Sequence, residues 1–320
     1  MTVRNEAEAL PRLFETLGSQ TRPPDEIIVA DGGSTDDTVK LLRDASVRFP
    51  LRVLECPRAN ISQGRNAAIA AADAEIIVST DAGVRLDARW FEKITAPFFD
   101  PNAPDVVSGF FLPDPHGAFE TALAATTLPF ARELRPETFL PSSRSVAFRK
   151  SAWQQVHGYP EWLDYCEDLI FDFDLRRAGF RFQFLPDARV YFRPRPTLAQ
   201  FFKQYYLYAR GDGKADLWLK RHLARYATYW VAIPFSFAVL PFAPLVALVL
   251  WLAAIIALCG TPYRRLVELW QTLSPVEKII AFGYVPVIRI TGDVAKMIGY
   301  PVGVWWRVAR PDTVHHNLTF

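Results

Sequence analysis

The chain is poor in the residues that build disulfide frameworks and zinc sites. Its 320 residues include three cysteines, Cys56, Cys166 and Cys259, which are widely spaced, with no CxxC pair and no histidine at ligand spacing. Neither a disulfide-stapled scaffold nor a structural zinc domain is therefore indicated. Three separated thiols suit a reducing, cytoplasmic setting.

An excess of charge of one sign is also lacking. The 36 Lys and Arg residues and 34 Asp and Glu residues leave a formal net charge of +2, and through the first half the two signs are interspersed. This argues against a basic stripe that binds nucleic acid, so nucleic acid is not an expected partner. The first residues contain no apolar stretch after a basic start, which predicts no secretory signal peptide.

The most informative absence lies in the last third, where no Asp, Glu, Lys or Arg occurs between Tyr226 and Tyr263. This stretch is long enough for one membrane-spanning helix of roughly 20 residues and almost long enough for two. Pro234, Pro241 and Pro244 interrupt it, so a helical hairpin or a re-entrant pair competes with one long tilted helix.

Positive charge flanks this stretch on both sides, at Arg221 and Arg225 before it and at Arg264 and Arg265 after it. Because cytoplasmic loops collect Lys and Arg, both flanks are expected on the cytoplasmic side, which favours the hairpin. A buried helix pair of a soluble protein is the alternative. Aromatic residues typical of a membrane interface argue against it: Tyr229, Trp230 and Trp251.

The segment 279–308 mixes apolar residues with charged ones, which are Arg289, Asp293, Lys296 and Arg307. This pattern indicates an amphipathic segment lying on the membrane rather than a further span. We therefore expect a membrane-associated helical region over residues 216–320, with the hairpin at about 226–263 and the interfacial segment at about 279–308.

The first part of the chain, residues 1–215, alternates short apolar runs with amphipathic stretches. This alternation predicts an α/β domain with an open, mixed, largely parallel sheet flanked by helices. The runs expected to form strands are 26–30, 51–55, 75–79, 106–111, 145–149, 181–185 and 189–192.

The strand expected at 26–30 leads directly into the turn DGGSTD, which begins at Asp31. In open α/β sheets, ligands lie at the carboxyl ends of strands, where a helix N-terminus offers free N–H groups to an anion. Asp31 is placed to accept hydrogen bonds from a ligand, although a plain turn with a helix cap explains the same letters. The spacing differs from GxGxxG, which disfavours a dinucleotide fold.

Two further acidic positions suggest chemistry. Asp81 follows the strand expected at 75–79 and could hold Mg²⁺ or Mn²⁺ bridging to a diphosphate, although one carboxylate is a weak metal site and a solvated Asp is the alternative. A second acidic cluster, 167–174, begins an amphipathic helix, and complementation of the helix dipole explains part of it. Asp168 is the candidate base for an acceptor hydroxyl.

Four segments in this order resemble the family 2 inverting glycosyltransferases of the GT-A fold. They are NEAEAL, EIIVADGGSTDDT, GRNAAIAAADAEIIVSTDAG, and HGYPEW followed by CEDLIFDFDLRRAGFRF. The resemblance covers about residues 2–210. It implies a GT-A catalytic domain that takes a sugar from a nucleotide-diphosphate sugar, with a UDP-sugar as the default donor.

The resemblance also implies roles for single residues. Glu6 and Asp31 match nucleotide-binding positions, and Arg65 matches a basic residue that approaches the nucleotide. Asp81 matches the first acid of the metal-binding DxD motif, so it belongs to the nucleotide site and is the expected ligand of Mg²⁺ or Mn²⁺.

For the acceptor side, Asp168 matches the family's catalytic base and Glu167 its neighbour, while His157 to Trp162 form the loop that shapes the acceptor pocket. Arg210 matches a basic segment that often contacts phosphate. An ordinary membrane-proximal arginine is an equal alternative for it.

Two departures from the family pattern change these expectations. Gly83 stands at the second acidic position of DxD, which puts the metal in doubt. The sequence also begins with Met1-Thr2-Val3 where the family has an apolar strand and a proline. The first strand is therefore expected to be missing or truncated and the nucleotide site weakened.

These features together predict an inverting, non-processive glycosyltransferase on the cytoplasmic face of the inner membrane, acting on a lipid-linked or cell-envelope glycan acceptor. A processive synthase is disfavoured because no QxxRW follows Gln204. A catalytically degenerate, sugar-nucleotide-binding membrane scaffold is the alternative. A soluble nucleotidyltransferase would have a basic Gly-rich N-terminal loop and no apolar tail.

Overall fold

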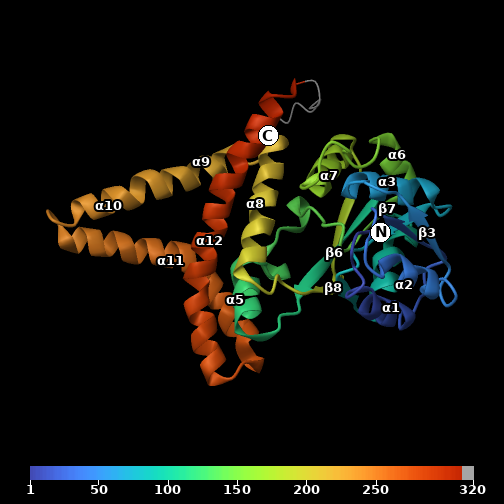
Figure 1. Ribbon diagram of the computed structural model, residues 1–320, viewed down its shortest axis with the longest axis horizontal. Helices are drawn as coiled ribbons and strands as arrows, with labels where there is room; N and C mark the ends of the chain where they lie inside the picture. Colours follow the sequence, from blue (N-terminus) through green and yellow to red (C-terminus); the bar gives the residue numbers. More distant parts are fainter. Residues whose placement is uncertain (312–320) are drawn as a thin grey trace. The chain divides into compact units, whose positions relative to one another are not determined.

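The computed structural model describes residues 1–311, and the chain divides into two compact units (Figure 1). The first unit consists of Met1–Asp114 and Phe130–Arg193. The second consists of Pro115–Pro129 and the residues from Pro194 onward. The last residues of the region expected over 216–320, namely 312–320, lie outside the described part.

The first unit begins with a parallel sheet ordered β1 (Thr2–Val3), β2 (Ile27–Asp31) and β3 (Leu51–Glu55). All of β2 is buried because helices cover both of its faces. Successive side chains of a strand point to opposite faces. Ile27 and Val29 accordingly pack in the cluster that contains α1 (Leu10–Gly18), and Ile28 and Ala30 pack with α3 (Ile61–Ala71). The helix α2 (Thr38–Ala45) adds Leu42 to the first cluster.

A second, five-stranded sheet follows in the order β4-β7-β6-β8-β5. Its strands are β4 (Ile76–Ser79), β5 (Val84–Leu86), β6 (Val106–Pro113), β7 (Val146–Arg149) and β8 (Phe182–Phe192). β6 and β8 run parallel, and the other three pairs are antiparallel. The remaining helices of the unit are α4 (Trp90–Thr95), α6 (Lys150–Gln155) and α7 (Glu167–Arg177), with short 3₁₀ turns at Ala96–Phe99, Ala131–Glu133 and Pro136–Thr138.

This arrangement confirms the predicted mixed α/β class with helices flanking the sheets. Two details differ from the sequence-based expectation. The runs at 181–185 and 189–192 form the single strand β8, because β6 pairs with both parts through a register irregularity between Ser108 and Phe110. β5, only three residues long, was not expected.

An apolar cavity of about 130 Å³ lies beside the two-residue strand β1. Met1, Ile28 of β2 and Ile77 of β4 contribute to its lining. The Met1 amino group donates to the Ile28 carbonyl at 2.9 Å. Burial, together with the positive charge of Arg65, lowers the pKa of this amine to about 5, so it is largely neutral near pH 7.

The second unit is entirely helical in its described regular structure. It contains α5 (Gly117–Thr127), α8 (Leu198–Lys214), α9 (Leu219–Ala227), a π-helical turn (Thr228–Ala232), α10 (Ile233–Val239), α11 (Pro244–Leu269), a 3₁₀ turn (Trp270–Thr272) and α12 (Pro275–Val308). A buried cluster joins α5, α8, α11 and α12 through residues such as Leu123, Phe201, Leu266 and Val285.

Glycines allow α8 and α12 to approach each other closely. A Cβ atom on Gly303 would overlap the carbonyl oxygen of Arg210, and one on Gly299 would overlap the carbonyl oxygen of Tyr206. On the facing helix α8, a Cβ atom on Gly213 would overlap the carbonyl oxygen of Tyr300. Small residues four apart on one helix permit this kind of backbone contact.

The charge-free stretch forms a helical hairpin, in which α10 and α11 project together from the rest of the unit (Figure 1). The indole Nε1 of Trp251 donates to Ser236 Oγ at 2.9 Å across the hairpin. Large apolar side chains are exposed along it, among them Phe242 at 88% and Leu245 at 76%. In the described part of the chain, one helix is apolar and long enough to cross a membrane, Pro244–Thr272, with a mean hydropathy of 2.4.

The glycine contacts predict that Gly303→Ala forces α8 and α12 apart and lowers the free energy of unfolding by about 1–3 kcal/mol, as overpacking does. Gly283→Ala is the matched control, since that position on α12 is open. It should be neutral or raise stability by up to about 1 kcal/mol through helix propensity. Thermal unfolding in mild detergent measures both, and equal melting temperatures would contradict the close-contact interpretation.

Candidate functional site

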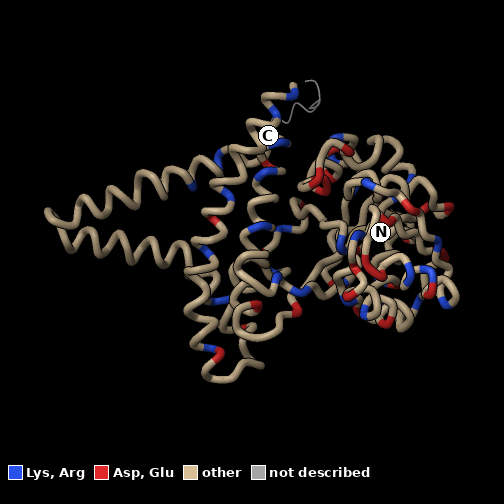
Figure 2. The backbone as a smooth tube through the Cα atoms, in the orientation of Figure 1, with Lys and Arg blue, Asp and Glu red and all other residues tan. Residues whose placement is uncertain are grey.

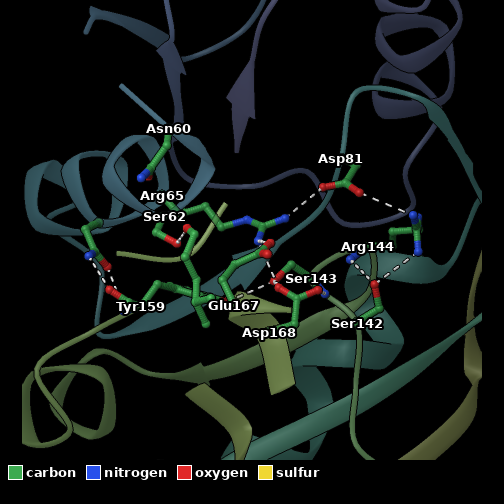
Figure 3. Close-up of polar contacts among 12 residues, drawn as sticks. Asn60, Ser62, Arg65, Asp81, Ser142, Ser143, Arg144, Tyr159, Glu167 and Asp168 are labelled. Carbon is green, nitrogen blue, oxygen red and sulfur yellow. Dashed lines mark hydrogen bonds and ion pairs between the residues drawn. The ribbon is translucent and has the colours of Figure 1, made fainter. Parts of the chain in front are cut away.

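The centre of the candidate site is the guanidinium group of Arg65, on α3 of the first unit (Figure 3). Asn60 begins this helix with a capping box, since its side chain accepts from the Gln63 amide while Gln63 returns a hydrogen bond to the Asn60 backbone. The cap sets the first turn, and Arg65 follows on the face that is buried. Its side chain is only 5% exposed.

Three carboxylates surround this buried guanidinium. Arg65 donates to Glu167 Oε1 at 2.5 Å and to Asp168 Oδ1 at 2.8 Å through one nitrogen. Through its other terminal nitrogen it donates to Asp81 Oδ1 at 3.3 Å. Burial alone would lower the pKa of Arg65, but attraction to the three carboxylates outweighs this and raises it. The arginine therefore remains charged and links α3 to α7 and to the end of β4.

Glu167 and Asp168 occupy the first turn of α7, where the helix dipole favours negative charge. Glu167 is buried, and burial, followed by repulsion from Asp168, raises its pKa to about 7. Asp172, one turn later, is also buried, and burial raises its pKa well above the usual range. Burial therefore favours the uncharged form of both acids, and Glu167 is partly protonated near neutral pH.

Asp168 differs from these two because it is partly exposed, at 24% of its side chain, and held from two sides. The Ser143 amide donates to Oδ2 at 3.2 Å, and the Ser143 hydroxyl donates to Oδ1 at 2.5 Å. The Ser143 hydroxyl also lies 3.0 Å from the Tyr159 hydroxyl. The carboxylate thus has a fixed orientation and an edge that another molecule can reach.

Asp81 follows β4 and meets Arg144, which precedes β7. The antiparallel register pairs Ser79 with Val146, so two further steps place Asp81 opposite Arg144. Arg144 Nε lies 3.6 Å from Asp81 Oδ2, and Thr80 donates its hydroxyl to the Arg144 carbonyl at 3.0 Å. Asp81, one third exposed, is therefore shared between two guanidinium groups.

The loop His157 to Trp162 is fastened to α3 by Asn66. The Asn66 amide donates to the Tyr159 carbonyl at 2.8 Å, and its side-chain oxygen accepts from the Tyr159 amide at 2.9 Å. Gly158 has a φ of +78°, and a Cβ there would press on Asn66 and Trp153. The loop therefore places the Tyr159 ring 5.4 Å from the Arg65 guanidinium carbon.

Asp31, at the end of β2, is buried and orders the Gly-rich turn that follows it. Its carboxylate accepts from the Gly33 amide and the Ser34 amide, each at 3.0 Å. Glu6 is joined to the same region, since its amide donates to the Thr38 hydroxyl at 2.8 Å. The turn-forming alternative for Asp31 is thus realised: Oδ2 accepts from both amides, and Oδ1 accepts from the Ser34 hydroxyl and, at 3.3 Å, from the Ser34 amide, so the turn uses both carboxylate oxygens.

Donor groups for a metal are few. Within residues 1–311 no group of three or more His, Cys, Asp and Glu side chains is arranged to hold an ion. Asp81 is the one predicted ligand, and two arginines already engage it. A Cβ on Gly83 would meet nothing within 4 Å. The residues present therefore do not form a prebuilt metal site.

The structure brings the side chains of Arg65, Asp81, Glu167 and Asp168 together. The sequence alone could not specify that these four residues are in contact. It adds Ser143 and Arg144, which the sequence analysis missed; the signal available was the polar run SSRS directly before the strand expected at 145–149. Arg210 lies on α8 of the second unit, where Gly303 packs against its carbonyl.

Comparison with known proteins yields both a family and relatives. Residues 1–153 match the family model described as Glycosyl transferase family 2. The chain is 27% identical over 273 residues to the succinoglycan biosynthesis protein ExoA of Rhizobium meliloti, covering 78% of each protein. It is 25% identical over 208 residues to the O-antigen chain rhamnosyltransferase WbaN of Salmonella anatum, covering 60% of this chain and 64% of the relative.

A solved structure shares the fold. The mannosyltransferase PcManGT from Pyrobaculum calidifontis, in complex with GDP-Man and Mn²⁺, superimposes with a TM-score of 0.54. The match covers 92% of this chain and 85% of that one at 19% identity. At this identity the likeness concerns the fold alone.

The pKa of Glu167 predicts a pH dependence of stability. Folding raises this pKa from 4.5 to about 7, so the contribution is complete below about pH 4.5 and is lost as the pH rises through about 7. Glu167→Gln should remove this slope, on the order of 3 kcal/mol across the interval. Denaturant unfolding at several pH values measures it, with exposed Glu55→Gln as the control. Parallel profiles for Glu167→Gln and wild type would refute the assignment.

Proposed function

The chain is a glycosyltransferase that carries a family 2 domain, and we propose that it transfers a sugar from a nucleotide-diphosphate sugar to a hydroxyl acceptor with inversion. The observation that carries this proposal is the fixed, partly exposed carboxylate of Asp168. A general base must be oriented and reachable, and Asp168 combines hydrogen bonds from Ser143 and Arg65 with an accessible edge.

In this proposal Asp168 removes the acceptor's hydroxyl proton while the acceptor oxygen attacks the anomeric carbon. The new carbon–oxygen bond forms as the bond to the diphosphate breaks, and the proton stays on Asp168. Glu167, with its pKa raised to about 7, is only partly ionised near pH 7 and so adds less than a full negative charge beside the base. Arg65 and Arg144 are the cations available to neutralise the departing diphosphate.

For the donor, we infer that Asp31 and Glu6 hold the nucleotide, because they lie at the Gly-rich turn after β2, and that Arg65 and Asp81 lie beside the diphosphate. GDP-Man is named for the mannosyltransferase that shares the fold. The default donor proposed for this chain remains a UDP-sugar. Arg210 stays a prediction as a phosphate contact.

For the acceptor, the names of the relatives refer to succinoglycan biosynthesis and to the O-antigen chain. We therefore propose a cell-envelope glycan, carried on a lipid and extended one sugar at a time. The exposed apolar side chains of the hairpin support attachment to the membrane, with the catalytic unit on its cytoplasmic face.

A divalent cation, Mg²⁺ or Mn²⁺, is proposed only as a supplement to these residues. When bound, such an ion neutralises diphosphate charge. The side chains around Asp81 do not by themselves fit an ion, so no step of the mechanism is routed through it.

The assignment of Asp168 predicts that Asp168→Asn lowers the transfer rate by at least about a hundredfold, because an amide cannot take the proton. Binding of the donor should stay largely intact, since the substitution keeps the shape. Asp172→Asn is the matched control on the same helix and should keep its activity, because that acid is buried one turn beyond Asp168 and burial favours its uncharged form. Initial rates and calorimetric donor binding measure both effects; full turnover by Asp168→Asn would remove this residue from the role.

The open space at Gly83 predicts a gain of metal binding. Gly83→Asp adds a second carboxylate two residues after Asp81 without steric conflict. Mn²⁺ should then bind more tightly in the presence of a nucleoside diphosphate, by on the order of tenfold, as an added oxygen ligand and charge would give. Gly83→Asn is the control of equal size. Identical Mn²⁺ titrations of the Asp and Asn variants would argue against a metal at this position.

A further inference from the structure

The root of the apolar hairpin carries a cluster of positive charge. Arg225 lies near the end of α9, directly before the charge-free stretch, and Arg289 and Lys296 lie on α12. Figure 2 shows Lys and Arg residues where the hairpin joins α12 and none along its two arms. We call Arg225, Arg289 and Lys296 the root cluster. All three belong to the second unit.

The carboxylate between them does not balance the root cluster. Asp293 accepts from Arg225 Nε at 2.7 Å and from the Tyr229 hydroxyl at 3.1 Å, and lies 3.6 Å from Arg289 Nε. Within the described residues, the Lys296 ammonium forms no ion pair; it lies 4.8 Å from the centre of the Tyr205 ring. The next carboxylate, Asp212, pairs with His222 at 3.2 Å.

The electrostatic cost of this arrangement is visible at Lys296. Burial, and then repulsion from Arg225 and Arg289, lowers its pKa to about 8 despite the attraction of Asp293 and Asp212. Arg225 and Arg289 share the Asp293 carboxylate, and Lys296 lies beside them without an ion pair in the described part of the chain, so positive charge is in excess at this partly buried place. An anion at this position would relieve the repulsion and accept hydrogen bonds from the ammonium and guanidinium groups.

The position of the root cluster relative to the hairpin indicates which kind of anion would bind there. The arm from Tyr226 to Leu240 has the length of about 22 Å at helical rise, so a hairpin that enters a bilayer penetrates much of its hydrocarbon core. The root then lies at the level of the lipid phosphates. The exposure of the side chains agrees with this placement. Asp293 is 7% exposed, whereas Arg289 is 38% exposed and can reach a headgroup.

We propose that Arg225, Arg289 and Lys296 bind the phosphate group of an anionic membrane lipid at the root of the hairpin, with Asp293 holding the two arginines in place. This proposal rests on the proposed attachment of the hairpin to the membrane. It assigns the apolar arms to insertion and the root cluster to selection of anionic lipid.

The test is flotation of the full chain with vesicles of phosphatidylcholine alone and of phosphatidylcholine mixed with phosphatidylglycerol. Each cation near a lipid surface raises the affinity for anionic lipid by about fivefold. Wild type should therefore bind the anionic vesicles more tightly than the neutral ones by on the order of tenfold or more. Arg289→Gln combined with Lys296→Gln should lose most of this preference and keep its binding to neutral vesicles. Arg225 is left intact because it pairs with buried Asp293.

Lys203→Gln combined with Lys220→Gln is the control, since it removes the same charge at two exposed positions of the same unit. It should keep nearly all of the preference. If the root variant and the control bind anionic vesicles equally, the proposal is wrong. If inorganic phosphate raises the wild-type melting temperature in detergent as much as phosphatidylglycerol does, a free-anion site replaces the lipid site.

Failure of the underlying membrane proposal gives a different result, because wild type would then bind neutral vesicles no better than a soluble protein. Folding of the root variant is checked by its melting temperature without lipid, which should match or exceed that of wild type as repulsion is removed. Phosphatidylglycerol should raise the melting temperature of wild type and not that of the root variant. None of these measurements depends on sugar transfer.

Discussion

Arg65 is almost completely buried, and a buried guanidinium is stable only where carboxylates and hydrogen bonds replace the water it has lost. Glu167, Asp168 and Asp81 provide that replacement from two further elements of the chain. Removing the arginine would leave acids buried without a counter-charge, and removing the acids would strand the arginine. The positions of Glu167, Asp168 and Asp81 around Arg65 depend on this mutual requirement.

The same requirement explains why neighbouring acids behave differently. Glu167 is buried against Arg65 and still has a raised pKa, because repulsion from Asp168 and loss of solvent exceed the attraction of one shared cation. Asp168 keeps a partly exposed edge and gains the Ser143 hydrogen bonds. Under the proposed function, a donor diphosphate lies beside Arg65 and Arg144, the two arginines that these carboxylates contact.

The helical unit is stabilised by a different interaction, the close approach of α8 and α12 at three glycines. The same unit carries a hairpin whose arms expose large apolar side chains. Positive charge gathers at the root of the hairpin, and the arms carry none (Figure 2). In the proposal made above, both follow from placing the root at a lipid surface.

Local sequence determined the ends of the strands, the Gly-rich turn after Asp31, the acidic start of α7 and the uncharged stretch after Tyr226, and with them the α/β class. These depend on residues close in the chain, whose spacing and polarity act directly on the local backbone. The partners of Arg65 depend instead on pairing between distant strands. The register of β4 with β7 brings Arg144 to Asp81, and α7 packing brings Asp168 to Ser143. No local preference specifies such a register, so only the tertiary structure decided it.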